Sequence, residues 1–281
     1  MTRPGRGRLY VVATPIGNLG DLSRRAIDTL AEADLIAAED TRTLRKLLSH
    51  AGISGKQMLA YHDANESRQS GALIARLKEG LSVALVSEAG TPVVSDPGHR
   101  LVEAAAAEGI EVSPVPGPSA VTALVSVAGL GGDGFVFEGF LPRAATARRH
   151  RLAAMKGSGR THVLFEAPGR LLVLLGAIET ELDDPELVVG RELTKLHEEV
   201  LRGTASGVAG ELAERERVRG ECVVAFHCPA TDSGEGVDVD SELVALLGVG
   251  LSVRDAARVL GLRGVDRKKV YAAARRMGRG S

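Results

Sequence analysis

The amino-acid sequence predicts an α/β fold of two domains, with a small helical tail at its C-terminal end. Short apolar runs alternate with segments of helical periodicity along the first half, a pattern typical of a mostly parallel sheet covered by helices. The chain has 281 residues, of which 44% are hydrophobic, so it can form one large or two medium cores. A Gly-, Asp- and Ser-rich stretch at residues 231–241 is read as a linker before a basic segment.

The first predicted domain comprises residues 1–115. Its strands are expected at residues 9–13, 35–38, 58–61, 83–87 and 110–114. Its helices are expected at residues 22–33, 43–50, 66–78 and 100–108. Gly52, Gly80 and Gly109 follow three of these helices, where C-cap glycines belong.

The second predicted domain comprises residues 116–230. It begins with a helix at 119–127, and further helices are expected near 169–181 and 207–217. Strands are expected at residues 135–141, 161–166, 187–191 and 222–227. Because the connections between these strands are shorter, we expect some of them to pair antiparallel. The tail, residues 242–281, contains two short helices at 252–262 and 267–276 that resemble a helix-turn-helix.

Charge is distributed unevenly although the net charge is only -1. From residue 254 onward, nine Lys or Arg stand against Asp255 and Asp266, and the N-terminal end carries Arg3, Arg6 and Arg8. Two basic ends suggest an anionic partner such as nucleic acid, but a solvated helix face explains the tail equally well.

Cysteine content and hydropathy indicate a cytoplasmic protein. Cys222 and Cys228 lie in or beside one expected strand and read as structural thiols in a reducing compartment. No cysteine or histidine spacing indicates a metal site. Residues 1–7 contain no apolar leader, and no segment is long enough to span a membrane.

Residues 14–21 form the most informative motif, Thr-Pro-Ile-Gly-Asn-Leu-Gly-Asp. It joins an expected strand to an expected helix, and Asp21 is a good N-cap for that helix. Such a glycine-containing turn brings backbone close to a small ligand. Its Gly-x-x-Gly spacing matches neither a dinucleotide-binding fingerprint nor a phosphate-binding P-loop.

Polar clusters follow other expected strands, at the edge where open α/β sheets bind ligands. Residues 39–42, Glu-Asp-Thr-Arg, either set one another's pKa values or simply cap the next helix through Asp40 or Thr41. In residues 61–66, His62 could be a general base, or it could pack at a strand end while Asn65 caps a helix. Taken alone, each cluster favours the capping interpretation.

Two longer loops favour ligand binding over simple turns. Residues 87–98 combine two prolines, two glycines and two acids without helical or strand periodicity, as binding loops do. Residues 115–120 place Pro118 at the start of a helix, with small residues that let a ligand approach backbone amides. Residues 165–170 and 190–195 pair acids with bases and could form the polar wall of a cleft.

Together these motifs resemble one family. The resemblance covers residues 8–227 and rests on a specific combination of runs: Thr14-Pro15-Ile16-Gly17-Asn18-Leu19, Glu39-Asp40-Thr41-Arg42, His62-Asp63-Ala64-Asn65-Glu66, Glu88-Ala89-Gly90-Thr91-Pro92 with Asp96-Pro97-Gly98, Pro116-Gly117-Pro118 and Arg191-Glu192-Leu193-Thr194-Lys195. The chain resembles the bacterial 16S ribosomal RNA (cytidine-2'-O)-methyltransferases of the tetrapyrrole methylase superfamily.

The resemblance implies an enzyme with S-adenosylmethionine bound in a cleft between two α/β domains. It also implies a homodimer that methylates the ribose 2'-hydroxyl of a cytidine in the decoding region of 16S rRNA, as free RNA or in the small ribosomal subunit, and so contributes to decoding fidelity. The family pattern assigns the cofactor to Pro15, Ile16, Gly17, Glu88, Gly90, Thr91, Ser119, Ala120, Phe165 and Arg191.

The sequence departs from the family pattern at two places. Glu88 stands where the family usually has Asp, which keeps the acid on a longer side chain. Arg143 and Ala144 follow Pro142 where a lysine two residues after the proline is usual, so contact with RNA could pass to Arg143, Arg148 or Arg149. Four residues of the tail are also candidates for RNA contact: Lys268, Lys269, Arg275 and Arg276.

Methyl transfer to a hydroxyl requires alignment with the methyl group and removal of a proton. The candidate bases are Glu39, Asp40, His62 and Glu66, with Arg42 and Lys195 expected to hold phosphate or lower the pKa of the hydroxyl. Neither a metal nor a membrane is implied. Two alternatives stay open: a C- or N-methyltransferase of a tetrapyrrole, and a non-catalytic RNA-binding or ribosome-assembly factor.

Overall fold

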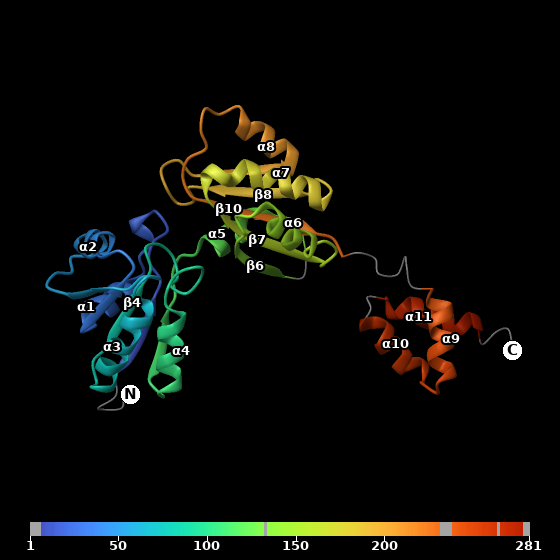
Figure 1. Cartoon of the computed structure of the whole chain (residues 1–281), viewed down its shortest axis with the longest axis horizontal. Coiled ribbons are helices and arrows are strands. Elements are labelled where there is room, and N and C mark those ends of the chain that lie inside the picture. Colours follow the sequence, from blue (N-terminus) through green and yellow to red (C-terminus); the bar gives the residue numbers. More distant parts are fainter. Residues whose placement is uncertain (1–6, 132–133, 231–237, 263–264, 278–281) are drawn as a thin grey trace.

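The computed structural model describes residues 7–131, 134–230, 238–262 and 265–277. Within these ranges the chain forms two five-stranded sheets, and Figure 1 shows them as two α/β halves with the C-terminal helices standing apart. Each sheet lies inside one of the two predicted domains. The boundaries at residues 115 and 230 themselves stay predictions.

The first sheet is entirely parallel, in the order β3-β2-β4-β1-β5. Every strand expected in this half is present: β1 (Arg8–Val12), β2 (Leu35–Ala38), β3 (Gln57–Ala60), β4 (Val83–Val86) and β5 (Glu111–Val115). The central strands β2 and β4 are buried along their whole length, which explains their unbroken apolar sequences.

Helices cover both faces of this sheet, as the alternation predicts. One face packs against α1 and α2, and the other packs against α3 and α4. Their bounds are α1 (Arg24–Glu32), α2 (Thr41–His50), α3 (Glu66–Lys78) and α4 (His99–Ala107), and a short 3-10 helix, η1 (Leu19–Asp21), precedes α1.

The second sheet is mixed, in the order β6-β7-β10-β8-β9. Only β6 and β7 pair parallel, and the remaining neighbours are antiparallel, which confirms the expected antiparallel pairing. The strands are β6 (Phe135–Phe140), β7 (Arg160–Glu166), β8 (Glu186–Arg191), β9 (Glu199–Thr204) and β10 (Cys222–Cys228). Both cysteines of β10 are buried and free.

The helices of this half also lie on both faces of their sheet. Three of them pack on one face and α5 packs on the other, in a core cluster that also contains Ile16 of the first half. They are α5 (Ala120–Ala128), α6 (Ala145–Ala153), α7 (Leu171–Leu182), preceded by the 3-10 helix η2 (Pro168–Arg170), and α8 (Ala205–Ala213).

The structure corrects three expectations about single elements. The first helix begins at Arg24, not at Leu22, because the Ser23 hydroxyl accepts from the Ala26 N–H and caps it, whereas Asp21 ends η1. Helix α6 was not expected, because among its nine residues only Arg148 and Leu152 are buried. Strand β9 was not expected either, because its sequence, Glu-Val-Leu-Arg-Gly-Thr, contains only two large apolar residues.

The tail contains three helices, not the two that the sequence predicts. They are α9 (Val239–Gly248), α10 (Val253–Leu262) and α11 (Arg267–Met277), and they share a small core of their own. Helix α9 begins inside the stretch read as a linker, because Asp238 accepts from two backbone N–H groups and caps it. The rest of that stretch, residues 231–237, lies outside the described residues.

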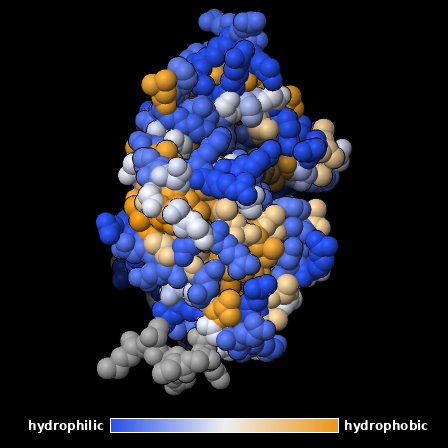
Figure 2. Space-filling view, turned by 90° about the vertical axis from the view of Figure 1, so that its left-hand side faces the viewer, coloured by the Kyte–Doolittle hydropathy of each residue, from blue (hydrophilic) through white to orange (hydrophobic). Residues whose placement is uncertain are grey.

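The surface is mainly polar on the face shown in Figure 2, where hydrophobic residues occur in small groups between hydrophilic ones. Within the described ranges, no helix is long and apolar enough to cross a membrane.

Candidate active site

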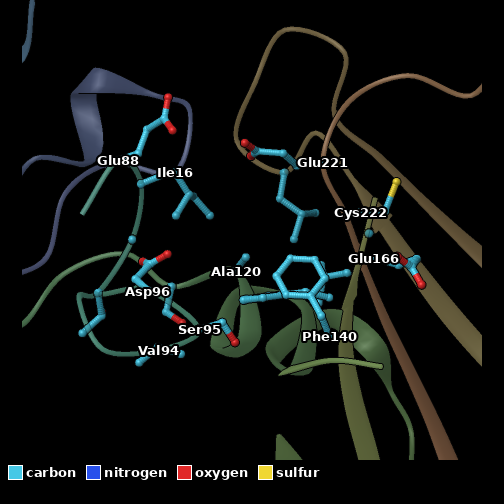
Figure 3. Close-up of a pocket in the computed structure, with 18 of the residues that line it drawn as sticks. Ile16, Glu88, Val94, Ser95, Asp96, Ala120, Phe140, Glu166, Glu221 and Cys222 are labelled. Atoms are coloured by element: carbon cyan, nitrogen blue, oxygen red, sulfur yellow. The ribbon is translucent and has the colours of Figure 1, made fainter. Parts of the chain in front are cut away.

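A cavity of about 400 Å³, called here the large cavity, opens between the two halves. The first half contributes Ile16 from the turn after β1, Glu39 directly after β2, and the loop at residues 87–98. The second half contributes the end of β7 and the start of β10 (Figure 3). Because all strands of the first sheet are parallel, their carboxyl ends meet at this edge, where open α/β sheets bind ligands.

The loop at residues 87–98 is a rigid wall of the large cavity. Thr14 and Gly90 exchange two backbone hydrogen bonds, of 2.8 and 3.0 Å, which attach the loop to the turn after β1. Gly90 and Gly98 have φ values of +82° and +135°, a region that favours glycine. At Gly98 a Cβ would also lie 2.7 Å from a methyl carbon of Leu85, so a side chain cannot be accommodated without movement.

The large cavity is strongly acidic. Five carboxylates line it, and no Lys or Arg of the described chain does. Two of the five are paired, Glu166 with Arg170 at 3.1 Å and Glu221 with Lys195 at 3.1 Å. The other three, Glu39, Glu88 and Asp96, form no ion pair with any described residue. A cationic ligand would therefore be favoured here.

Asp96 shows the effect of these unpaired negative charges most clearly. Burial, together with the nearby charges of Glu39, Glu88 and Asp63, raises the pKa of the Asp96 carboxyl to about 6, although a hydrogen bond from Ser87 opposes the shift. In Figure 3 the Asp96 carboxylate points into the cavity, whereas the Glu88 carboxylate points away from it. Asp96 therefore gains most from a positive charge placed in the cavity.

Aromatic rings form the opposite wall. Phe165 contacts Phe140 with ring centroids 5.6 Å apart, and Phe137 supports Phe165 edge-on at 4.9 Å. Phe140 is 56% exposed, which is unusual for so large an apolar ring, and it faces the cavity (Figure 3). This wall can stack against a flat ring of a ligand.

A second, smaller space of about 320 Å³, called here the small cavity, adjoins the large one. The turn after β1, one side of α2 and the end of β4 form it, and Lys195 and Glu221 reach it from the second half. Ile16, Glu88, Ala89 and Glu221 line both cavities. The two spaces are therefore adjacent compartments of one cleft.

Most residues expected to bind the cofactor lie at this cleft. The large cavity is lined by seven of them: Ile16, Glu88, Gly90, Thr91, Ser119, Ala120 and Phe165. Pro15 and Gly17 line only the small cavity. Arg191 lines neither, because its guanidinium bonds to Glu199 at 2.8 Å and to the Arg219 carbonyl at 3.1 Å. The binding roles themselves stay predictions.

The expected catalytic residues are dispersed. Glu39 lines the large cavity and Lys195 lines the small one. Asp40 accepts from the Arg42 backbone and guanidinium, and these hydrogen bonds lower the pKa of its carboxyl to about 2. As the helix cap of α2, Asp40 performs the structural role that the sequence left open, with Arg42 as its partner.

His62 and Glu66 also have structural partners and line neither cavity. The Nε2 atom of the His62 ring lies 3.2 Å from the side-chain amide nitrogen of Asn65. The backbone N–H of His62 donates to the side-chain oxygen of Asn65. Glu66 accepts from the Tyr61 hydroxyl at 3.2 Å and from the Gly98 N–H at 3.1 Å. Glu66 thus anchors the far end of the 87–98 loop, which gives it a positioning role.

The basic residues near α6 do not form one exposed patch. Arg148 is only 8% exposed and donates to the Arg143 carbonyl, so its guanidinium is not presented for RNA contact as expected. Arg149 pairs with Glu181 at 2.6 Å. Arg148 is buried because it lies one turn before Leu152, on the face of α6 that packs against the core.

The tail presents its basic residues on α11. A shallow surface hollow there is lined by Lys268, Tyr271, Arg275 and Arg276, with Ala272 between them. Arg276 also pairs with Asp240 of α9 at 2.9 Å. Lys269, the fourth expected contact, lies on the same helix.

Several cavity residues were not singled out from the sequence. Asp96 and Ser95 belong to a loop recognised only as a whole, and Phe140 and Cys222 belong to strands read as structural. Glu221 has one weak signal in the sequence, its place immediately before the last expected strand. Among the described residues no group of three His, Cys, Asp or Glu side chains could hold a metal ion.

Comparison with known proteins agrees with this geometry. The sequence model of the Tetrapyrrole (Corrin/Porphyrin) Methylases matches residues 8–209. The structure is similar to the methyltransferase CobJ, with a TM-score of 0.59 and 18% identity over 80% of this chain and 94% of that one. It is also similar to cobalt precorrin-4 methyltransferase, with a TM-score of 0.58 and 17% identity over 78% and 94%. Fold and family model together define a tetrapyrrole methylase.

Relatives in sequence narrow this class. A protein of Mesorhizobium japonicum is 43% identical over 96% of this chain and 92% of its own length, and one of Xylella fastidiosa is 45% identical over 94% and 98%. A third, of Thermotoga maritima, is 47% identical over 78% of this chain and 97% of its own length. All three are named ribosomal RNA small subunit methyltransferase I. The chain belongs to this branch of the tetrapyrrole methylase family.

Proposed function

We propose that this protein transfers the methyl group of S-adenosylmethionine to the ribose 2'-hydroxyl of a cytidine in the decoding region of 16S rRNA. The observation that carries the proposal is the large cavity, with three unpaired carboxylates on one wall and aromatic rings on the other. The names of the relatives support the ribosomal substrate. We further propose that it acts as a homodimer in the cytoplasm and contributes to decoding fidelity.

The residues of the large cavity fit S-adenosylmethionine. Its sulfonium and ammonium groups are positive, and Glu39 and Asp96 offer negative charge without a competing cation. Its adenine ring is flat, and Phe140 and Phe165 offer a stacking surface. The cavity volume of about 400 Å³ lies within the range of sites for small cofactors.

When bound, the sulfonium supplies an activated methyl group and its own leaving group. The protein has to hold the acceptor hydroxyl in line with that methyl group and remove a proton from it. The bound loop at residues 87–98 keeps the carboxylate wall in place through the Thr14–Gly90 hydrogen bonds. Of the bases expected from the sequence, only Glu39 lines the large cavity. Asp96 and Glu88 join it as candidates.

The proposal is tested by methyl transfer from labelled S-adenosylmethionine to small ribosomal subunits that lack their native modifications. Nucleoside analysis of the product should give labelled 2'-O-methylcytidine. Label in another nucleoside would contradict the cytidine assignment. Cofactor binding with label only in an added porphyrinoid would favour the tetrapyrrole alternative, and RNA binding without cofactor binding would favour a non-catalytic factor.

A further inference from the structure

We propose that the small cavity binds the acceptor nucleotide, and that the Thr14 hydroxyl and the Lys46 ammonium are its recognition groups. The inference rests on the proposed function, because it takes RNA as the acceptor. It assigns a subsite, and it gives a role to Thr14, the first residue of the 14–21 motif, and to Lys46, which belongs to none of the motifs. The volume of about 320 Å³ suits one nucleotide turned into the cleft.

The position of the small cavity is right for an acceptor. Ile16, Glu88, Ala89 and Glu221 form a wall that it shares with the large cavity. Ligands in the two compartments would meet at the boundary that these four residues surround. Contact is needed there, because a methyl group can pass only between groups that touch. An acceptor in the small cavity therefore needs no rearrangement of the loop at residues 87–98.

Thr14 supplies an unsatisfied polar group. Thr14 is only 2% exposed and lines the small cavity. Its side-chain Oγ1 has no hydrogen-bond partner. Its backbone is fixed by the two hydrogen bonds to Gly90. Buried hydroxyls almost always have a partner, so an unpaired one beside a cavity indicates a ligand that completes it. A ribose or base hydrogen-bonding group has the required chemistry.

The charge of the small cavity is also suited to a nucleotide. Lys46 and Lys195 line it, whereas no cation lines the large cavity. Lys195 is held by Glu192 at 2.9 Å and Glu221 at 3.1 Å, and its stem lies over Gly17, where a Cβ would be 2.2 Å away. Lys46 is exposed on α2 and forms no ion pair with any described residue. It is therefore the cation available to a phosphate.

The methyl transfer at the boundary between the two cavities balances in bonds and protons. A lone pair of the ribose 2'-oxygen forms the new C–O bond, and the S–CH3 bond breaks with its electron pair going to sulfur. The hydroxyl proton passes to the carboxylate of Glu88, which lines both cavities and is open to solvent for its release.

Two variants and a matched control test the assignment by kinetics. Thr14→Val keeps the shape and removes the hydroxyl, and Lys46→Gln removes the charge. Each should lower kcat/KM for unmodified small subunits about tenfold or more, and should leave the dissociation constant of S-adenosylmethionine within about twofold. Arg45→Gln, on the same helix but outside the cavity lining, should change neither. Unchanged kcat/KM in both variants, or an equal loss of cofactor affinity, would overturn the inference.

A second measurement separates this inference from the proposed function. Thr43 lines the small cavity, so Thr43→Cys places a thiol there that a maleimide can modify. Cys222 and Cys228 are buried, but Cys222 lines the large cavity, so the unsubstituted protein gives the background rate with and without the cofactor. Unmodified small subunits should slow the modification, and S-adenosylmethionine alone should not. Protection by the cofactor alone would overturn the assignment. Protection by subunits without any methyl transfer would retain the RNA subsite and refute the proposed reaction.

Discussion

Asp96 holds its proton more tightly than an ordinary aspartate, and this has a consequence for stability. Its pKa is raised from 3.8 to about 6 in the folded protein, so the folded state binds more protons than the unfolded state between these values. The contribution of Asp96 to the free energy of unfolding is fully present below about pH 4 and is lost as the pH rises through 6. Ionised Asp96 thus destabilises the free protein near neutral pH.

We therefore predict that Asp96→Asn stabilises the free protein above pH 6, by on the order of 1 kcal/mol after allowance for solvent screening, with no gain at pH 4. The same variant should bind S-adenosylmethionine about tenfold more weakly at pH 7.5, because a charge facing the cation is lost. Thermal melts at both pH values and calorimetric titration measure these effects. A gain in stability that is equal at both pH values would contradict the assigned cause.

Glu88 should act on turnover more than on cofactor affinity. If it accepts the hydroxyl proton, Glu88→Gln should lower kcat about 100-fold, within the usual range for a positioned base. Glu88→Asp, which restores the acid usual in the family, should retain most activity. Glu32→Gln, at an exposed site at the end of α1, is the control and should be neutral. Equal activity of the Gln and Asp variants would exclude Glu88 as the base.

At the scale of elements, the loop at residues 87–98 depends on glycine. Gly98→Ala would force a side chain into a φ of +135° and against Leu85, so we expect a loss of about 1–3 kcal/mol of stability and weaker cofactor binding. Gly71→Ala is the matched control, because Gly71 lies exposed inside α3 with no atom near its Cβ position. It should be neutral or stabilising by up to about 1 kcal/mol. Urea unfolding of both variants checks the contrast.

Elements with a continuous apolar signal could be predicted from the sequence, and the others could not. Strands β2 and β4 could be predicted because they are buried along their whole length and their sequences are unbroken apolar runs. Strand β9 and helix α6 contain too few large apolar residues to show a period. The site followed the same rule: loops were recognised as wholes, but the burial that gives Asp96 its pKa arises only when distant segments meet.

At the scale of the whole molecule, the tail is separable from the cleft. Helices α9 to α11 share their own core, and none of their residues lines the large or the small cavity. The match with the Thermotoga maritima relative covers 97% of that protein but only 78% of this chain. The tail therefore contributes no residue to either cavity, and its role in RNA binding stays a prediction.

We predict that deleting residues 238–281 weakens RNA binding and makes it less dependent on salt, because fewer phosphates are neutralised. Affinity for S-adenosylmethionine should stay unchanged. Titrations with small ribosomal subunits at several salt concentrations measure both slope and affinity. Unchanged RNA affinity would favour the interpretation of the tail as a stabilising helical unit with a solvated basic face.

The contacts that close the cleft also determine how the protein should melt. Ile16 lies in the core of the second half, Lys195 reaches over Gly17 of the first, and a Cβ at Gly139 would lie 3.1 Å from the Ser95 hydroxyl. Neither half can lose its structure without disturbing the other at these points. In differential scanning calorimetry the two sheets should unfold in one cooperative transition, with the tail as a separate one. Because the cleft residues also hold the two halves together, substitutions in the cleft affect the thermal stability of both sheets. Variants selected for better catalysis should therefore also change their shared melting temperature.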